Sequence, residues 1–320
     1  MLFTPLGLAF IGLPGLVIAL IASFIAYAVQ FPLRGLLSGS GLTTTYSGVI
    51  ATEGLLRIVL PLALALLGVT NPVVFAFVVA VAAAVAVVPA LLGSDRSWLV
   101  HTAPRRRVFA SQAGRLIVAA LSIQLLLNSS TLLAKAVAEG SDGVLAGQIL
   151  TCLSIARIPI FVYQVAQILY LPRLAGEWTK GELRSVRRTL AIALAAAVVV
   201  GVLITGGMAT LGPWITSLLF GPDLVLSLQG TVLVSAGVAF FMVAVVASDG
   251  AVALGAHTLV LRSWVVAVLC AIPVALFAGD LLLRVTGPFI VGALAAFLQL
   301  IAGVVHRYRR RLRDLEGSAR

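Results

Sequence analysis

The chain has 320 residues, of which 61% are hydrophobic and only 10% are charged, with a formal net charge of +11. Soluble domains carry about 25% charged residues, and a water-soluble protein of this length could not bury so much apolar surface. The composition therefore excludes a soluble globular protein and indicates a polytopic membrane protein.

Apolar runs of about 20 residues, the length that crosses a bilayer as a helix, recur along the chain. They predict an all-α protein with nine transmembrane helices, over residues 5–30, 44–69, 72–92, 115–136, 143–171, 189–208, 226–248, 256–278 and 283–305. The first run has no basic start and is too long for a signal peptide. Cys152 and Cys270 lie inside predicted helices, where a packing role is favoured.

The positive charges are unevenly distributed between the predicted helices. Eighteen of the 22 arginines and lysines, Arg34 among them, lie in alternate connecting segments or in the C-terminal tail. The positive-inside rule then predicts a cell-membrane protein with its N-terminus outside and its C-terminus in the cytoplasm. In this setting the basic segments are expected to contact anionic membrane lipids, not nucleic acid.

Four cationic residues depart from this pattern: Arg57, Lys135, Arg157 and Arg284. Lys135 and Arg284 lie near the outer helix ends, from which they can reach the interface. Arg57 and Arg157 lie deep, where a charge costs about 3 kcal/mol or more to insert. Such residues normally face a bundle interior or a watery cavity, together with a partner.

Helical periodicity of 100° per residue groups the polar residues of three predicted helices into stripes. One stripe contains Gln124, Asn128, Thr131 and Lys135, a second contains Ser154, Arg157, Gln164 and Gln167, and a third contains Tyr46, Glu53 and Arg57. Ligand binding is one interpretation of the amide side chains, and hydrogen bonding between helices is the other.

The charged members of these stripes allow sharper expectations. Glu53 and Arg57 are one helical turn apart, which favours a structural salt bridge, with proton transfer at Glu53 as the alternative. Asp249 is a second residue that could carry protons. Arg157 has no acid within one turn, so we expect an anionic ligand to balance its charge.

An internal repeat is the next feature of the sequence. "TNPVVFAFVVAVAAAVAVV" begins at Thr70 and "TGPFIVGALAAFLQLIAGVV" begins at Thr286, and both place Thr-x-Pro at an expected outer helix start. "GLTT" at Gly41 and "GAHT" at Gly255 are separated by nearly the same interval. The first three helices are therefore predicted to be a parallel repeat of the last three, as in transporters built from two similar halves.

Three segments resemble the multidrug/oligosaccharidyl-lipid/polysaccharide (MOP) exporter superfamily. "RGLLSGSGLTTTYSGVIATEGLLRIVLPLALALLG" resembles the middle of its N-terminal lobe, and "WITSLLFGPD" its amphipathic outer segment. "LLAKAVAEGSDGVLAGQILTCLSIARIPIFVYQVAQILYLPRLAGEW", with its turn at Pro172-Arg173-Leu174-Ala175, resembles the start of the second lobe in the polysaccharide branch. The resemblance implies a two-lobe transporter that alternates around a cationic cavity.

Family members usually have twelve or more helices, so the resemblance implies that the first three are missing. We expect residues 1–93 to form a partial N-terminal lobe, 94–114 a basic cytoplasmic linker, 115–306 a six-helix C-terminal lobe and 307–320 a basic tail. The missing helices are expected to be encoded upstream of Met1 or supplied by a second chain.

The function that the resemblance implies is movement of a lipid-linked saccharide across the cytoplasmic membrane for cell-surface polysaccharide synthesis. Guanidinium groups suit a diphosphate, since they offer fixed paired donors. The expected substrate contacts are Arg157, Arg57, Lys135, Asn128, Gln124 and Gln164, with Glu53 as a coupling or structural residue.

Two other functions are alternatives to transport of a lipid-linked saccharide. A cation-coupled multidrug exporter would be expected to expose deep acids. Glu53, the one deep acid that the sequence offers, is already near Arg57, which disfavours this function. A non-transporting scaffold of a polysaccharide machine, with a polymerase as its partner, is the third interpretation. The chain has no Walker A motif, and His101, His257 and His306 lack zinc-ligand spacing, so neither an enzyme nor a metal or cofactor is expected.

Overall fold

The computed structural model describes residues 14–39, 42–92, 106–136 and 142–318, and over these residues the protein is helical without strands. The helices are α2 (Pro14–Gly39), α3 (Thr43–Leu66), α4 (Pro72–Val85), α5 (Val88–Leu92), α6 (Arg106–Leu127), α7 (Ser129–Ala136), α8 (Asp142–Ala156), α9 (Ile158–Thr179), α10 (Leu183–Phe220), α11 (Leu228–Ala253), α12 (His257–Phe277) and α13 (Leu281–Ser318). A short 3-10 turn, η2 (Pro222–Leu224), follows α10. The all-α prediction is confirmed.

The predicted membrane spans agree with the helices of the described residues. Eight helical stretches are long and apolar enough to cross a membrane, with α4 and α5 counted as one stretch and α8 with the start of α9 as another. α6 with α7 makes a ninth if that bent pair is one span. Large apolar side chains are exposed on them, such as Leu66 at 80% and Phe277 at 82%. Lipid tails cover such side chains in a bilayer. The chain is a multi-pass membrane protein.

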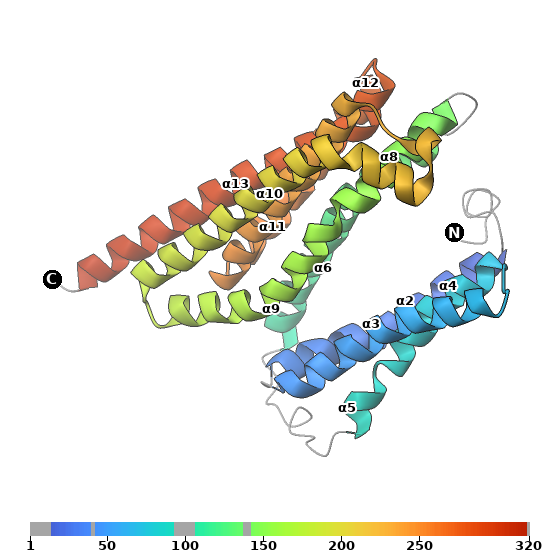
Figure 1. The fold of residues 1–320 in the computed structure, drawn as a ribbon. Helices are drawn as coiled ribbons and strands as arrows, with labels where there is room; N and C mark the ends of the chain where they lie inside the picture. The colour runs from blue at the N-terminus through green and yellow to red at the C-terminus, as the bar shows by residue number, and fades with distance from the viewer. Residues whose placement is uncertain (1–13, 40–41, 93–105, 137–141, 319–320) are drawn as a thin grey trace. The chain divides into compact units, whose positions relative to one another are not determined.

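The chain divides into two compact units, residues 1–104 and 105–320. In the first unit α2, α3 and α4 lie side by side (Figure 1). Asn71 caps α4 by accepting the Val73 N–H at 2.9 Å, and Pro72 opens the helix where a missing N–H has no cost. Leu37 and Val49 are fully buried in a small core where α2 and α5 both pack on α3.

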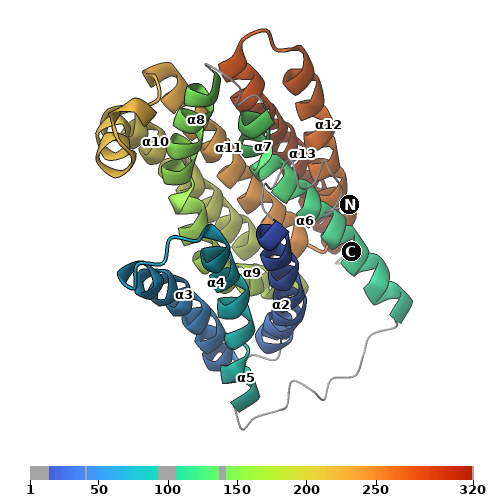
Figure 2. The same cartoon turned by 90° about the vertical axis from the view of Figure 1, so that its right-hand side faces the viewer.

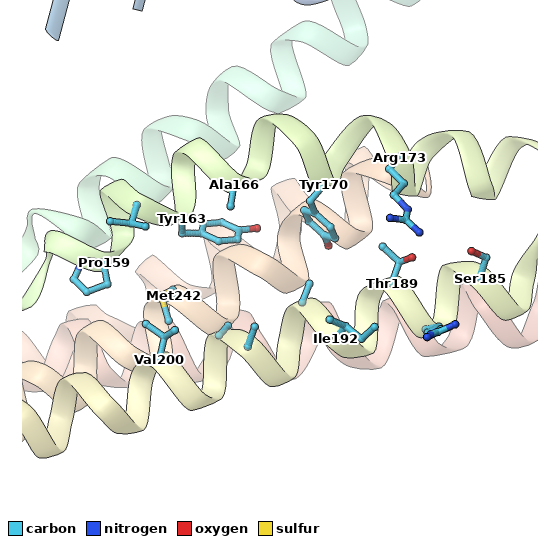
Figure 3. A pocket seen from close by; sticks show the side chains of 15 residues that line it. Pro159, Tyr163, Ala166, Tyr170, Arg173, Ser185, Thr189, Ile192, Val200 and Met242 are labelled. Carbon is cyan, nitrogen blue, oxygen red and sulfur yellow. The ribbon is translucent and has the colours of Figure 1, made fainter. Parts of the chain in front are cut away.

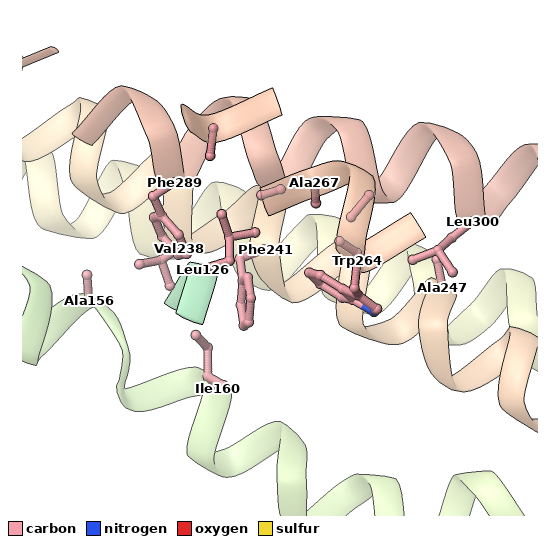
Figure 4. Close-up of a cluster of buried hydrophobic side chains, with 14 of the residues drawn as sticks. Leu126, Ala156, Ile160, Val238, Phe241, Ala247, Trp264, Ala267, Phe289 and Leu300 are labelled. Atoms are coloured by element: carbon pink, nitrogen blue, oxygen red, sulfur yellow. The ribbon is translucent and has the colours of Figure 1, made fainter. Parts of the chain in front are cut away.

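The second unit has the larger core. Phe241 of α11, Trp264 of α12 and Phe289 of α13 are almost fully buried and pack ring against ring (Figure 4). The bent rod of α6 and α7 lies beside α12 and α13 (Figure 2). A Cβ added to Gly303 would lie 2.3 Å from a Leu259 methyl group, so a larger residue there would require the Leu259 side chain to move.

Several predicted boundaries are wrong. The helix expected over 143–171 breaks at Arg157 into α8 and α9. The helix expected over 189–208 extends over Leu183–Phe220 and includes the segment "WITSLLF". The last helix, α13, continues through the basic tail to Ser318. Arginine and leucine are good helix formers, so a charged or amphipathic stretch need not end a helix.

Other predictions fall on or near the segments that are not described. Residues 5–13 of the first predicted helix and residues 94–105 of the predicted linker, with His101, lie outside the described residues, and α6 already begins at Arg106 within that linker. Thr70 precedes α4 as expected, whereas Thr286 lies inside α13, not at its start.

Candidate functional site

Glu53 of α3 is the centre of a polar cluster in the first unit. Its buried carboxylate accepts hydrogen bonds from Tyr27 at 2.8 Å and Gln30 at 3.2 Å, both on α2. The predicted contact with Arg57 is present at 3.0 Å, and Arg34 forms a second ion pair with the same carboxylate. Arg34, expected in a cytoplasmic loop, lies inside α2 and completes the cluster.

This Glu53 cluster has an excess of positive charge, because two guanidinium groups face one carboxylate. The Arg34 side chain is 19% exposed and that of Arg57 is 46% exposed. Arg57 also lies 5.7 Å from the centre of the Tyr27 ring, which steadies its position. Arg57 therefore has a face that is free to contact an anion, whereas Glu53 is enclosed.

Arg157 lies at the break between α8 and α9 and contacts the break between α6 and α7. α8 ends at Ala156, and Pro159 in the first turn of α9 lacks the N–H needed to continue the ladder. α6 ends at Leu127, where the chain bends by 49° into α7. The Arg157 guanidinium donates to the free Leu127 carbonyl, and a cation at a helix C-terminus is favoured by the helix dipole.

The other predicted substrate contacts are only partly gathered at this point. Gln124 and Asn128 lie at the α6–α7 bend, and Asn128 donates to the Gln124 backbone carbonyl at 2.9 Å and to its side-chain oxygen at 3.4 Å. Lys135 lies in the last turn of α7, and Gln164 is exposed on α9. The structure thus brings Gln124, Asn128 and Arg157 together at the two helix breaks.

Asp249 of α11 is a second buried acid, only 6% exposed. The Tyr163 hydroxyl donates to one carboxylate oxygen at 2.5 Å, and the Gln167 amide donates to the other at 2.7 Å. Both donors come from α9, one turn apart. Among the described residues, no arginine or lysine forms an ion pair with Asp249, so neutral groups hold this acid.

A groove of about 810 Å³ lies between α9 and α10. Along most of its length the walls are apolar, formed by residues such as Pro159, Ile192, Val200 and Met242 (Figure 3). At the other end lie the polar side chains of Arg173, Ser185 and Thr189 (Figure 3), and Arg188, next to Thr189 in α10, also lines the groove. The groove is amphipathic along its axis, and no described acidic side chain lines it.

The polar end of the groove is fixed by Glu177, which is buried behind it. Arg173 and Thr189 each donate to one Glu177 oxygen at 3.1 Å. Burial raises the pKa of the Glu177 carboxyl, but hydrogen bonds from Ser185, Thr189 and Arg173 and the charge on Arg173 outweigh it and lower that pKa below its usual range. Ionised Glu177 therefore holds Arg173 while Arg188 has no ion pair in the described chain.

Comparison with known proteins gives one informative match. No protein-family model matches the sequence, and no curated protein matches it. The structure is similar to the crystal structure of a mutant of the MATE transporter VcmN from Vibrio cholerae, with a TM-score of 0.69 at 16% sequence identity. The alignment covers 96% of this chain and 73% of the other. The fold is that of a MATE transporter. The all-α expectation agrees with this fold.

Sequence reasoning missed the grouping of Asp249 with Tyr163 and Gln167 on this MATE fold. Tyr163 and Gln167 are one turn apart, and this spacing was a detectable signal for a shared polar face. The pairing with Asp249 was not detectable, because the two segments are far apart in the chain. Among the described residues, no group of three or more His, Cys, Asp or Glu side chains could hold a metal ion.

Proposed function

We propose that this chain is a transporter of the MOP exporter superfamily and that it moves a lipid-linked saccharide across the cytoplasmic membrane. The observation that carries the proposal is the groove between α9 and α10, which is apolar along its length and ends at Arg173 and Arg188. A lipid-linked saccharide combines a long hydrocarbon tail with an anionic phosphate group, and the groove offers a matching surface to each.

The chemistry of the groove fits an anionic amphiphile better than a cationic drug. A cation would be expected to require an acid in the wall, and the groove has none among its described residues. The apolar wall suits a hydrocarbon chain, while Arg188 offers paired donors to a phosphate oxygen. Ser185 and Thr189 add hydroxyl donors at the same end.

The saccharide is proposed to contact the polar residues outside the groove. Arg57 has an exposed face beside the Glu53 cluster, and Gln124, Asn128 and Arg157 meet at the helix breaks. Lys135 and Gln164 complete the proposed set of contacts. Arg157 has a structural partner as well, because it holds the Leu127 carbonyl, so its role in binding must be separated from its role in folding.

The test is flux of a fluorescent lipid-linked saccharide in vesicles that contain the purified full chain. Ala196 lines the groove, whereas the neighbouring Ala195 is exposed on a different face of α10. Ala196→Trp should fill the groove and abolish flux, and Arg188→Gln should reduce it. Ala195→Trp is the matched control and should transport normally. Equal flux from Ala196→Trp and Ala195→Trp would sink the proposal, and absence of flux from the unmodified chain would favour a scaffold.

A cation-coupled exporter is the second candidate, and Asp249 favours it. This acid is buried, and among the described residues it is held only by the neutral donors Tyr163 and Gln167, so it can take up a cation or a proton without leaving a buried arginine unpaired. Flux of a cationic dye that depends on a proton or sodium gradient, and that Asp249→Asn abolishes, would support this candidate over the first.

A further inference from the structure

A second concave surface, separate from the groove, lies where the ends of α9, α12 and α13 meet. We call it the basic pocket. It has a volume of about 540 Å³ and is lined chiefly by Arg262 of α12, by Arg307, Arg310 and Arg311 of α13, and by Trp178 of α9. It shares no lining residue with the α9–α10 groove.

The positive charge of the basic pocket is not balanced by the protein. Four arginines line it, and Asp314 is its one acidic lining residue. None of these arginines forms an ion pair within the described residues. Arg311 instead lies 5.8 Å from the centre of the Trp178 ring, which holds one guanidinium against an aromatic wall. An anionic ligand would supply the missing charge.

The start of α12 adds further donors on the same side. Ala256 is the N-cap of α12 and provides no side-chain hydrogen bond, so the first-turn N–H groups keep no capping partner. Ala256 and Leu259 both line the pocket. The close packing of Leu259 on Gly303 fixes α12 against α13 and so keeps the arginines of the two helices together. An uncapped helix N-terminus favours phosphate groups.

The apolar surface beside the pocket points to a lipid as the source of the phosphate. Arg262, Leu269 and Leu276 are spaced by seven residues and therefore share one face of α12. Leu269 is 57% exposed and Leu276 is 61% exposed. A headgroup bound at Arg262 would thus have its acyl chains along an apolar helix face within the bilayer.

We propose that the basic pocket is a binding site for an anionic phospholipid whose headgroup carries two phosphates. Cardiolipin is a lipid of this kind and serves as the probe in the experiment below. Basic pockets between transmembrane helices on the cytoplasmic side bind headgroups of this kind. Two phosphodiester charges match the excess of arginine over Asp314 better than one does. The proposal is independent of the transported substrate.

The experiment measures cardiolipin binding to the purified full chain by native mass spectrometry, with phosphatidylglycerol and phosphatidylcholine as comparison lipids. Arg262→Gln combined with Arg307→Gln should weaken cardiolipin binding about 25-fold, from about fivefold for each arginine near an anionic surface. The control removes the same charge elsewhere, by Arg184→Gln with Arg187→Gln at the start of α10, and should change binding less than twofold. Lysine in place of both pocket arginines should retain most of the affinity.

Each outcome decides the proposal. Selective loss in the pocket variant, with both glutamine variants keeping the same thermal transition in lipid-free detergent, supports it. Equal losses in pocket and control variants would show that net charge alone attracts the lipid and would overturn it. Binding of phosphatidylglycerol as tight as that of cardiolipin would overturn it, because one phosphate would then suffice. Full displacement of cardiolipin by soluble pyrophosphate would also overturn it, because the pocket would then recognise phosphate groups without a lipid.

Discussion

The helices α2–α4 and α11–α13 show the same packing pattern. Within each set, the first and second helices each pack more extensively on the third than on each other, although α11 packs as extensively on α10 as on α13. The parallel repeat predicted from the Thr-x-Pro and Gly-x-x-Thr segments stays a prediction, because Thr70 precedes α4 whereas Thr286 lies inside α13. The two sets differ in their buried acids, since Glu53 lies on the second helix of the first set and Asp249 on the first helix of the other.

The surroundings of these two acids differ more than their burial does. Glu53 is 7% exposed and Asp249 is 6% exposed, yet Glu53 faces two guanidinium groups while Asp249 faces a hydroxyl and an amide. Protonating Glu53 would leave two cations without their counter-charge, which is costly in a low-dielectric interior. Protonating Asp249 leaves no such charge. We therefore expect Glu53 to have a structural role and Asp249 to be the acid that is available for proton or cation coupling.

The largest effect is expected at Glu53. Glu53→Gln leaves Arg34 and Arg57 without an acid and should destabilise the protein by about 3–5 kcal/mol. Abundance in the membrane and the thermal transition in detergent should both fall. Adding Arg34→Gln to Glu53→Gln should restore part of the lost stability, because removing both partners of a buried ion pair destabilises a protein less than removing one of them. A stable Glu53→Gln protein whose flux has an altered pH dependence would instead make Glu53 a proton site.

A smaller loss of stability is expected at Arg157. Like Asp249, it is a charged side chain that is held by a neutral group, in this case the Leu127 carbonyl. Arg157→Ala frees the Leu127 carbonyl and should cost about 1.5–3 kcal/mol, the range for a hydrogen bond to a charged group. If Arg157 also binds substrate, flux per folded molecule should vanish in Arg157→Ala. Arg157→Lys should rescue flux only in part, because a point charge replaces a paired donor.

These two consequences of Arg157→Ala are measured separately. Flux is divided by the amount of folded protein in the same vesicles, which removes the folding contribution. Normal flux per folded molecule would end the ligand hypothesis and leave Arg157 as a link between the two helix breaks.

At Asp249 we expect little change in stability and a large change in coupling. Asn in place of Asp249 is close in shape and can still accept a hydrogen bond from Tyr163 or Gln167. The thermal transition should therefore shift by less than for Arg157→Ala. Any proton- or sodium-driven flux should be lost, whereas flux that needs no gradient should persist. If the flux of Asp249→Asn still depended on the gradient, Asp249 would not be the coupling acid, and the proposed contrast with Glu53 would be wrong.

Sequence predicted the helices well and the polar sites less well, for a physical reason. Span number follows from hydrophobicity along the chain, and the Glu53–Arg57 contact follows from helical spacing. The partners that decide each site are distant in sequence: Arg34 for Glu53, Leu127 for Arg157, and Tyr163 for Asp249. Such contacts depend on how helices pack, which a single sequence does not contain. The break at Arg157 was missed because Pro159 lies in an otherwise uninterrupted apolar run.

The smallest effect is expected at Glu177, the acid that holds the polar end of the α9–α10 groove. The pKa of its carboxyl is lower in the folded protein than in the unfolded chain, because the donors around it outweigh its burial. Its contribution to stability is therefore fully present above the unfolded pKa of about 4.3 and is lost as the pH falls through the folded pKa. Glu177→Gln lacks this contribution at every pH.

The difference between the thermal transitions of the unmodified protein and Glu177→Gln should thus be constant from neutral pH down to about 5 and should narrow below about 4. Glu182→Gln, at an exposed acid in the same turn, is the control and should run parallel to the unmodified protein. A difference that stays constant into the acid range would show that Glu177 holds Arg173 and Thr189 by shape and hydrogen bonding alone, without its charge.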